Sequence, residues 1–192
     1  MKICMFGSAN DRIDPEYIQE ASKLGAELGR RGHELVFGAG KQAMMGAAAR
    51  AAHESGARVT GISPKFFLDM GVLYEECDEL ILTRTMSVRK RRMTELAEGY
   101  VIMPGGYGTM DELFEILTLT QIGKLHAPIV FVNTKGFFDD IVAMIRRLAD
   151  EGFVSVANSR IFSVASNASE ALDIIEKEAA ERAAKKPTKK KK

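Results

Sequence analysis

Short runs of apolar residues alternate along the chain with longer segments that mix apolar and polar positions. The apolar runs, at residues 2–6, 34–37, 58–62, 79–82, 100–103, 128–133 and 160–166, are predicted to form β-strands. Helices are predicted between them, at residues 15–32, 43–55, 87–98, from Thr109, at 137–152 and from about Ser169. Residues 63–76 are expected to form a loop or a broken helix.

This alternation predicts an α/β fold in which helices cover both faces of a parallel sheet. No internal repeat or linker divides the sequence, so residues 1–184 are expected to form a single Rossmann-like, doubly wound domain. In such folds ligands bind outside the carboxyl ends of the strands. The residues that follow each predicted strand are therefore the first candidates for a site.

Charge, cysteine content and hydropathy limit the partners and the cellular compartment that the sequence predicts. Six lysines lie in residues 185–192, a tail that is expected to be disordered because it holds too little apolar surface to fold. The net charge of +1 therefore leaves −5 on the rest of the chain, which limits nucleic-acid binding to weak contacts of the tail. Cys4 and Cys77 form no C-x-x-C pair, which indicates a reduced, cytoplasmic protein. No apolar run approaches the ~20 residues of a membrane span.

Three predicted strands end in turns with small side chains: "GSAN" at 7–10, "GAGKQ" at 38–42 and "PGGYGT" at 104–109. The second turn matches the G-x-G-x-x-G/A fingerprint of dinucleotide-binding folds. A NAD site also needs an acidic residue near the end of the next strand, and residues 58–63 contain none. The fingerprint alone therefore does not support a NAD site.

The turn "PGGYGT" is the strongest candidate for a phosphate site. Gly105, Gly106 and Gly108 let the backbone approach a ligand, and Thr109 is expected to cap the helix that it begins. Free N–H groups at a helix N-terminus bind anions such as phosphate. Glu112 follows at about the fourth residue of that helix.

A basic run, Arg89 to Arg92, lies in the first turns of a predicted helix. Cations at that end oppose the helix dipole unless an anion offsets them. Arg89 and Lys90 are therefore expected to contact phosphate or substrate, and Arg91 and Arg92 to face solvent. The three histidines are scattered without metal-ligand spacing, so no metal site is predicted.

These motifs together resemble one family. "PGGYGTMDE" fits P-G-G-x-G-T-x-x-E, "MSVRK" fits M-x-x-R-K, and "GS" at 7–8 and "QIG" at 121–123 agree. The chain thus resembles the Lonely guy (LOG) family, cytokinin riboside 5′-monophosphate phosphoribohydrolases often labelled lysine decarboxylases. The resemblance implies a homodimeric hydrolase without a cofactor. Its expected reaction splits the N-glycosidic bond of an adenine-type nucleoside 5′-monophosphate, cytokinin riboside monophosphate or AMP, into free base and ribose 5-phosphate.

By motif position, the resemblance places the catalytic residues at Arg89 and Glu112. Two features depart from the family pattern: Ala39 and Ala43 replace glycines, and Leu119 replaces a tryptophan, so the identity of the base stays open. Nucleotide contacts are expected at Gly7, Ser8, Met86, Lys90, Gly105, Gly106, Tyr107, Gly108, Thr109, Met110, Asp111 and Thr118.

Two other functions were weighed. A decarboxylase with pyridoxal phosphate would need a Schiff-base lysine, and Lys90, the one candidate, has arginine neighbours that fit an anion clamp better. A non-catalytic nucleotide sensor or carrier on the same fold is the main alternative. The presence of both Arg89 and Glu112 favours an enzyme, because a phosphate binder has little use for an acid beside the anion.

Overall fold

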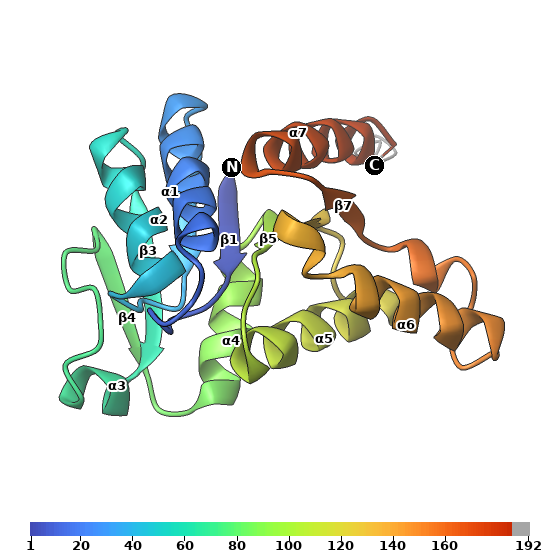
Figure 1. Cartoon of the computed structure of the whole chain (residues 1–192), viewed down its shortest axis with the longest axis horizontal. Coiled ribbons are helices and arrows are strands. Elements are labelled where there is room, and N and C mark those ends of the chain that lie inside the picture. The colour runs from blue at the N-terminus through green and yellow to red at the C-terminus, as the bar shows by residue number, and fades with distance from the viewer. Residues whose placement is uncertain (186–192) are drawn as a thin grey trace, which may run out of the picture.

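The computed structural model describes residues 1–185, and its centre is one seven-stranded parallel sheet (Figure 1). The strand order is β4-β3-β2-β1-β5-β6-β7, so the chain reverses its direction of winding between β4 and β5. β1 pairs with both β2 and β5 and lies at the middle. The strands are β1 (Lys2–Phe6), β2 (Glu34–Phe37), β3 (Val59–Pro64), β4 (Glu79–Thr83), β5 (Gly99–Ile102), β6 (Ile129–Val132) and β7 (Ser163–Ala165).

Helices cover both faces of the sheet, as predicted (Figure 1). In β1, Ile3 and Met5 pack on the side of α1, α2 and α7, whereas Cys4 and Phe6 pack on the side of α4, α5 and α6. This period of two is what a strand buried on both faces requires. The helices are α1 (Pro15–Arg30), α2 (Ala43–Glu54), α3 (Lys65–Asp69), α4 (Met86–Leu96), α5 (Tyr107–Gln121), α6 (Asp139–Asp150) and α7 (Ala168–Lys185), with short 3₁₀ turns at Thr134–Gly136 and Asn158–Arg160.

The predicted elements are confirmed, with shifts at their ends. Residues 63–76, predicted to form a loop or a broken helix, contain the end of β3 and the short helix α3. α5 begins at Tyr107 and not at Thr109. α7 continues through Lys185, the first residue of the predicted tail. The rest of that tail, residues 186–192, lies outside the described residues.

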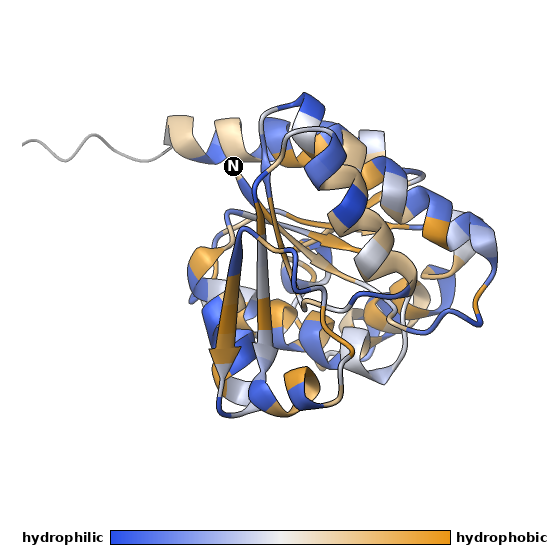
Figure 2. Ribbon diagram, turned by 90° about the vertical axis from the view of Figure 1, so that its left-hand side faces the viewer, coloured by the Kyte–Doolittle hydropathy of each residue, from blue (hydrophilic) through white to orange (hydrophobic). Residues whose placement is uncertain are grey.

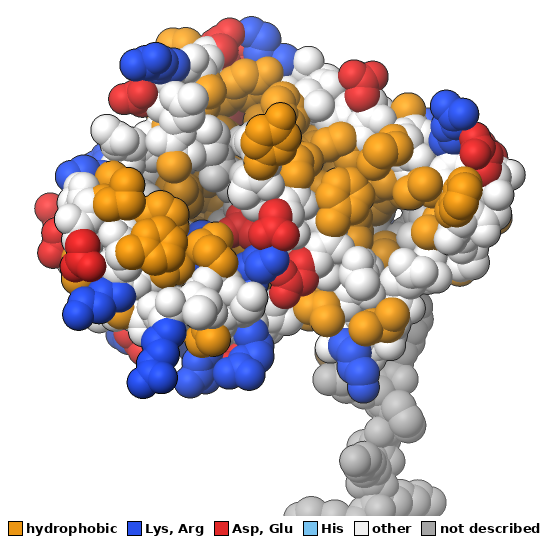
Figure 3. Space-filling view, turned by 90° about the horizontal axis from the view of Figure 1, so that it is seen from below, with side chains coloured by type: hydrophobic (Ala, Val, Ile, Leu, Met, Phe, Trp, Pro, Cys, Tyr) orange, Lys and Arg blue, Asp and Glu red, His pale blue; other side chains and the backbone are white. Residues whose placement is uncertain are grey.

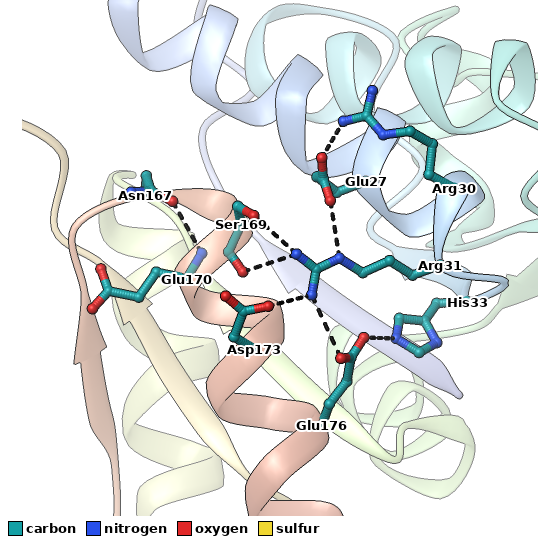
Figure 4. Close-up of polar contacts among 9 residues, drawn as sticks. All are labelled: Glu27, Arg30, Arg31, His33, Asn167, Ser169, Glu170, Asp173 and Glu176. Carbon is teal, nitrogen blue, oxygen red and sulfur yellow. Dashed lines mark hydrogen bonds and ion pairs between the residues drawn. The ribbon is translucent and has the colours of Figure 1, made fainter.

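α1 anchors α7 through two charged side chains. Glu20, which is buried, accepts a hydrogen bond at 2.6 Å from the backbone N–H of Ala168, the first residue of α7. Arg31, just after α1, reaches Asp173 at 2.6 Å and also pairs with Glu27 (Figure 4). Helix α7, near the C-terminus, is thereby fixed beside the N-terminal helix.

Apolar residues are concentrated in the sheet, the inner layer of the fold. Figure 2 shows apolar residues along the strands and a mixture of apolar and polar residues on the surrounding helices. This is the pattern of helices that bury one side against a sheet and expose the other. Among residues 1–185, no helix is long and apolar enough to span a bilayer.

Candidate active site

A cavity of about 490 Å³ opens at the carboxyl ends of β1, β2 and β5, where ligands bind in folds of this kind. Its lining comes from the turns after these strands, from α2, α4 and α5, and from residues 67–73. A second cavity, of about 470 Å³ between α6 and β7, contains none of the predicted site residues. The residues lining the first cavity are Gly7, Ser8, Ala9, Asn10, Gly38, Gly40, Lys41, Gln42, Met45, Phe67, Met70, Val72, Leu73, Met86, Arg89, Gly106, Gly108, Thr109 and Glu112.

A buried ion pair lies in the wall of this cavity. Arg89 Nη1 is 2.6 Å from Glu112 Oε1, and the two residues are 7% and 6% exposed. Arg89 Nε also donates to the backbone carbonyl of Ile62 at 3.0 Å. Burial raises the pKa of the Glu112 carboxyl above its ordinary value, while the charge and hydrogen bond of Arg89 act in the opposite direction. The cavity thus contains a carboxylate held in place by a fixed cation.

Local structure explains why the arginine reaches this position. Thr85 caps α4 by accepting a hydrogen bond from the Val88 N–H at 3.2 Å, so Arg89 is the fourth residue of the helix. Its guanidinium passes the end of β2 at Gly38, where any Cβ would overlap it. The anion expected to offset the cation at this helix end is Glu112 itself. Arg91 and Arg92, as predicted, are exposed, and both pair with Glu95.

The turn after β5 contains glycines of two kinds. A Cβ on Gly105 would overlap the hydroxyl of Thr109, so packing alone requires glycine there. At Gly106 and Gly108 a Cβ would meet nothing within 4 Å, and neither residue has a positive φ. The protein's own structure therefore does not require glycine at these two positions, whereas a ligand lying against the backbone would.

The predicted cap of α5 is wrong. Gly106 is the N-cap, no side chain caps the helix, and Thr109 is a buried residue of its first turn. Glu112 is consequently the sixth helical residue and not the fourth. Without a side-chain cap, the first N–H groups of α5 keep their capacity to bind an anion.

The structure brings eight of the predicted residues to the cavity: Gly7, Ser8, Met86, Arg89, Gly106, Gly108, Thr109 and Glu112. Gly105 is not in the lining, and Tyr107 is 97% exposed. The four others lie together in a shallow depression on the outer side of α5: Lys90, Met110, Asp111 and Thr118.

Lys90 is held on that outer side by two acids. Its ammonium is 2.9 Å from Asp111 Oδ2 and also contacts Glu115. Burial lowers the pKa of Lys90, but the hydrogen bonds to Glu115 and Asp111 outweigh this, and the net shift is upward. Lys90 is thus a cation already neutralised by its neighbours and directed away from the cavity of its own chain.

Several lining residues were not predicted. Lys41 and Gln42 belong to the turn after β2, which the glycine fingerprint marked but to which no site residue was assigned. Met45, Phe67, Met70 and Leu73 form an apolar wall. The signal for that wall in the sequence was the run of apolar residues within 66–73, in a segment without a strand or helix pattern.

Comparison with known proteins agrees with this geometry. A family model described as "possible lysine decarboxylase" matches residues 45–175. The cytokinin riboside 5′-monophosphate phosphoribohydrolase LOG2 of Arabidopsis thaliana is 35% identical over 175 residues, covering 91% of this chain and 82% of that protein. The chain belongs to the LOG family. The rice (Oryza sativa subsp. japonica) phosphoribohydrolase LOG is 36% identical over 170 residues, covering 88% of this chain and 70% of its own length.

Solved structures with lower identity share the fold of this LOG-family chain. The X-ray structure of TM1055 has a TM-score of 0.71 at 22% identity and covers 92% of this chain and 98% of its own. A molybdenum cofactor carrier protein from Chlamydomonas reinhardtii has a TM-score of 0.69 at 19% identity, covering 94% and 98%. At these identities the likeness concerns the fold alone.

Proposed function

We propose that this protein hydrolyses the N-glycosidic bond of an adenine-type nucleoside 5′-monophosphate to free base and ribose 5-phosphate. The observation that carries the proposal is the placement of a buried carboxylate, Glu112, in the same cavity as the open turn of Gly106 and Gly108. Relatives that cover most of this chain carry the name of that reaction.

The turn after β5 supplies the phosphate site. The N–H groups of the first residues of α5 have no side-chain cap, and two glycines leave space above the backbone. A phosphate there gains hydrogen bonds and the positive end of the helix dipole. Nucleoside monophosphates should therefore bind far better than the matching nucleosides.

The position of Glu112 suits the next atoms of such a ligand. It lies four residues, about 6 Å of helix rise, beyond Gly108, so a ribose attached to the phosphate lies over the carboxylate. Departure of the base leaves positive charge on the ribose ring, which the Glu112 carboxylate stabilises. Arg89 holds that carboxylate at 2.6 Å and fixes its direction before the substrate arrives.

The other end of the cavity is apolar. Met45, Phe67, Met70 and Leu73 line it, and three of them come from the segment between β3 and β4. A purine with an apolar substituent buries more surface against this wall than plain adenine does, at roughly 25 cal/mol per Å². We therefore assign a cytokinin-type base, adenine with an apolar N6 substituent, as the preferred leaving group.

We also propose that α5 packs against a second copy of the chain. Its outer side exposes Tyr107, Phe114 and Ile122 beside the depression that holds Lys90 and Asp111. Figure 3 shows charged side chains of both signs between two hydrophobic areas on this side of the molecule. Such a surface is self-complementary in a two-fold dimer. Nucleotide contacts of Lys90, Met110, Asp111 and Thr118 would then be made across the interface.

One assay tests the reaction. The protein is incubated with isopentenyladenosine monophosphate, AMP and the two matching nucleosides, and released base and ribose 5-phosphate are separated by chromatography. We expect release from both monophosphates, faster with the isopentenyl base, and little from the nucleosides. Equal turnover of AMP and adenosine would refute the phosphate site.

The same assay separates the enzyme from a carrier. Tight binding of a monophosphate without release of base would contradict hydrolysis and support a non-catalytic nucleotide carrier.

For the dimer, Phe114→Glu is expected to convert the species seen by light scattering to monomer. A wild-type monomer at assay concentration would refute that interface.

A further inference from the structure

One charged side chain in the cavity is not neutralised by a neighbour. The lining contains three charged residues, and two of them, Arg89 and Glu112, form an ion pair at 2.6 Å. The third, Lys41, is exposed, and its ammonium makes no ion pair with the acidic side chains of residues 1–185. Lys41 therefore gives the cavity its net positive charge and a charged N–H donor that no acid in this part of the chain neutralises.

The turn that carries Lys41 is held in a strained conformation. Ala39 and Ala43, before and after Lys41, have φ values of 60° and 47°. Residues other than glycine avoid this left-handed region. Hydrogen bonds from Tyr74 N–H to the Ala39 carbonyl (2.8 Å) and from Lys41 N–H to the Val72 carbonyl (3.0 Å) hold it. Backbone strain of this kind persists where the surroundings fix it, and it is concentrated at functional sites.

The place of Lys41 along the edge of the sheet defines which part of a nucleotide it meets. Its turn follows β2, and the turn with Gly106 and Gly108 follows β5, with β1 between the two strands. Two strand spacings amount to about 10 Å, which spans a nucleotide from its phosphate to its base. Met45 and Phe67 line the same cavity and supply an apolar bed for a base.

We propose that Lys41 is the acid that protonates the departing base, an assignment that rests on the proposed function. The bond between the anomeric carbon and the base nitrogen breaks, and its electron pair stays on the base. Lys41 donates one proton to the base. A water molecule adds its oxygen to the anomeric carbon and releases one proton, which returns the amine of Lys41 to its charged form. Glu112 stabilises the cationic ribose between the two events.

The test uses two leaving groups. The base of isopentenyladenosine monophosphate must gain a proton to leave as a neutral molecule. The base of 7-methyladenosine 5′-monophosphate already carries a positive charge and leaves neutral without one. Loss of a catalytic acid should therefore slow hydrolysis of the first substrate by about 10²-fold or more. The rate for the second substrate should change by less than about threefold.

Lys41→Met is the test variant, and Lys65→Met is the matched control, because Lys65 is an exposed lysine of α3 outside the cavity lining. Turnover is measured as release of ribose 5-phosphate, with spontaneous hydrolysis subtracted and folding checked by the thermal transition. Lys65→Met should match the wild type on both substrates. Lys41→Arg, which keeps the charge but holds its proton more firmly, should lose turnover of the isopentenyl substrate as Lys41→Met does.

Two results would overturn the assignment. An equal loss on both substrates would show that Lys41 binds the nucleotide without supplying a proton, and an unchanged Lys41→Met enzyme would show that it does neither. Failure of the wild-type protein to release base from either substrate would overturn the proposed function and the role of Lys41 with it.

Discussion

Two strand-to-helix turns at the same edge of the sheet look alike in sequence and differ in structure. The turn after β5, residues 103–106, contains glycines in ordinary backbone conformations, and two glycines near the start of α5 face open space. The turn after β2, residues 38–42, has one alanine in a left-handed conformation within it and another directly after it, and is tied to residues 72–74 by hydrogen bonds. The first presents bare backbone to a ligand, whereas the second presents side chains from a fixed loop.

The difference shows that the number of glycines in a turn does not tell how many of its positions have a backbone conformation that favours glycine. Gly106 and Gly108 could be alanine as far as the protein's own atoms are concerned, while Ala39 and Ala43 occupy conformations that favour glycine. Where the folded chain itself gives no reason for a glycine, a ligand lying against the backbone is the readiest explanation. Four predictions examine this contrast, from the largest expected effect to the smallest.

The largest effect is expected at Glu112, on the helix that follows the bare turn. Glu112→Gln keeps the shape of the side chain and removes its charge, so turnover should fall by ~10² or more, about 3 kcal/mol of transition-state stabilisation. Affinity for the monophosphate should hold. Glu151→Gln removes an exposed carboxylate that lines neither the cavity nor the depression on α5, and serves as the control in the same steady-state assay. An active Glu112→Gln enzyme would remove this residue from the chemistry.

Substitutions at two neighbouring glycines of the turn after β5 should separate an effect on stability from an effect on ligand affinity. Gly105→Ala places a methyl group against Thr109 and should lower the free energy of unfolding by about 1–3 kcal/mol. Gly106→Ala meets no protein atom and should leave stability unchanged, yet weaken monophosphate binding by about tenfold, or ~1.4 kcal/mol. Denaturant unfolding and calorimetric titration measure the two quantities. Unchanged affinity in Gly106→Ala would contradict the phosphate site.

The pH dependence of activity should reflect the burial of the carboxylate. Burial raises the pKa of Glu112 above the ordinary value of 4.5, although Arg89 opposes the shift. Because the ionised form stabilises the cationic ribose, kcat/KM should be lost as pH falls through the raised pKa, and its acid midpoint should lie above 4.5. A midpoint at or below that value would show that Arg89 dominates in the free enzyme.

The smallest effect is expected in the turn after β2. Ala43→Gly relieves a left-handed conformation at φ 47° but adds disorder to the unfolded chain, so the free energy of unfolding should rise by less than about 1 kcal/mol. Turnover should stay near the wild-type value, since the backbone hydrogen bonds of the turn remain. A loss of stability on denaturant unfolding would show that the methyl group contributes more by packing than its backbone conformation costs.

The alternation of elements was predictable from the chain alone. Strands buried on both faces must be nearly uniformly apolar, so β1, β2, β5 and β6 stand out in the sequence. A helix N-terminus with several glycines is a local anion site, and its signal needs no distant residue. The family motifs pointed to Arg89 and Glu112 but did not decide that they form an ion pair, because the two residues are 23 positions apart and meet only when β5 and the helices around it are packed.

Tertiary structure alone decided the rest of the site. Lys90 follows Arg89 directly, but one residue turns about 100° around a helix, so Lys90 faces Asp111 and Glu115 outside the cavity. Ala39 and Ala43 are left-handed because contacts with residues 72–74 and α2 hold the turn, and no local preference predicts this. Apart from Met45 of α2, the apolar wall comes from residues 67–73, whose sequence has no regular period. Their position is set by packing against the turn after β2, and that contact exists only in the folded chain.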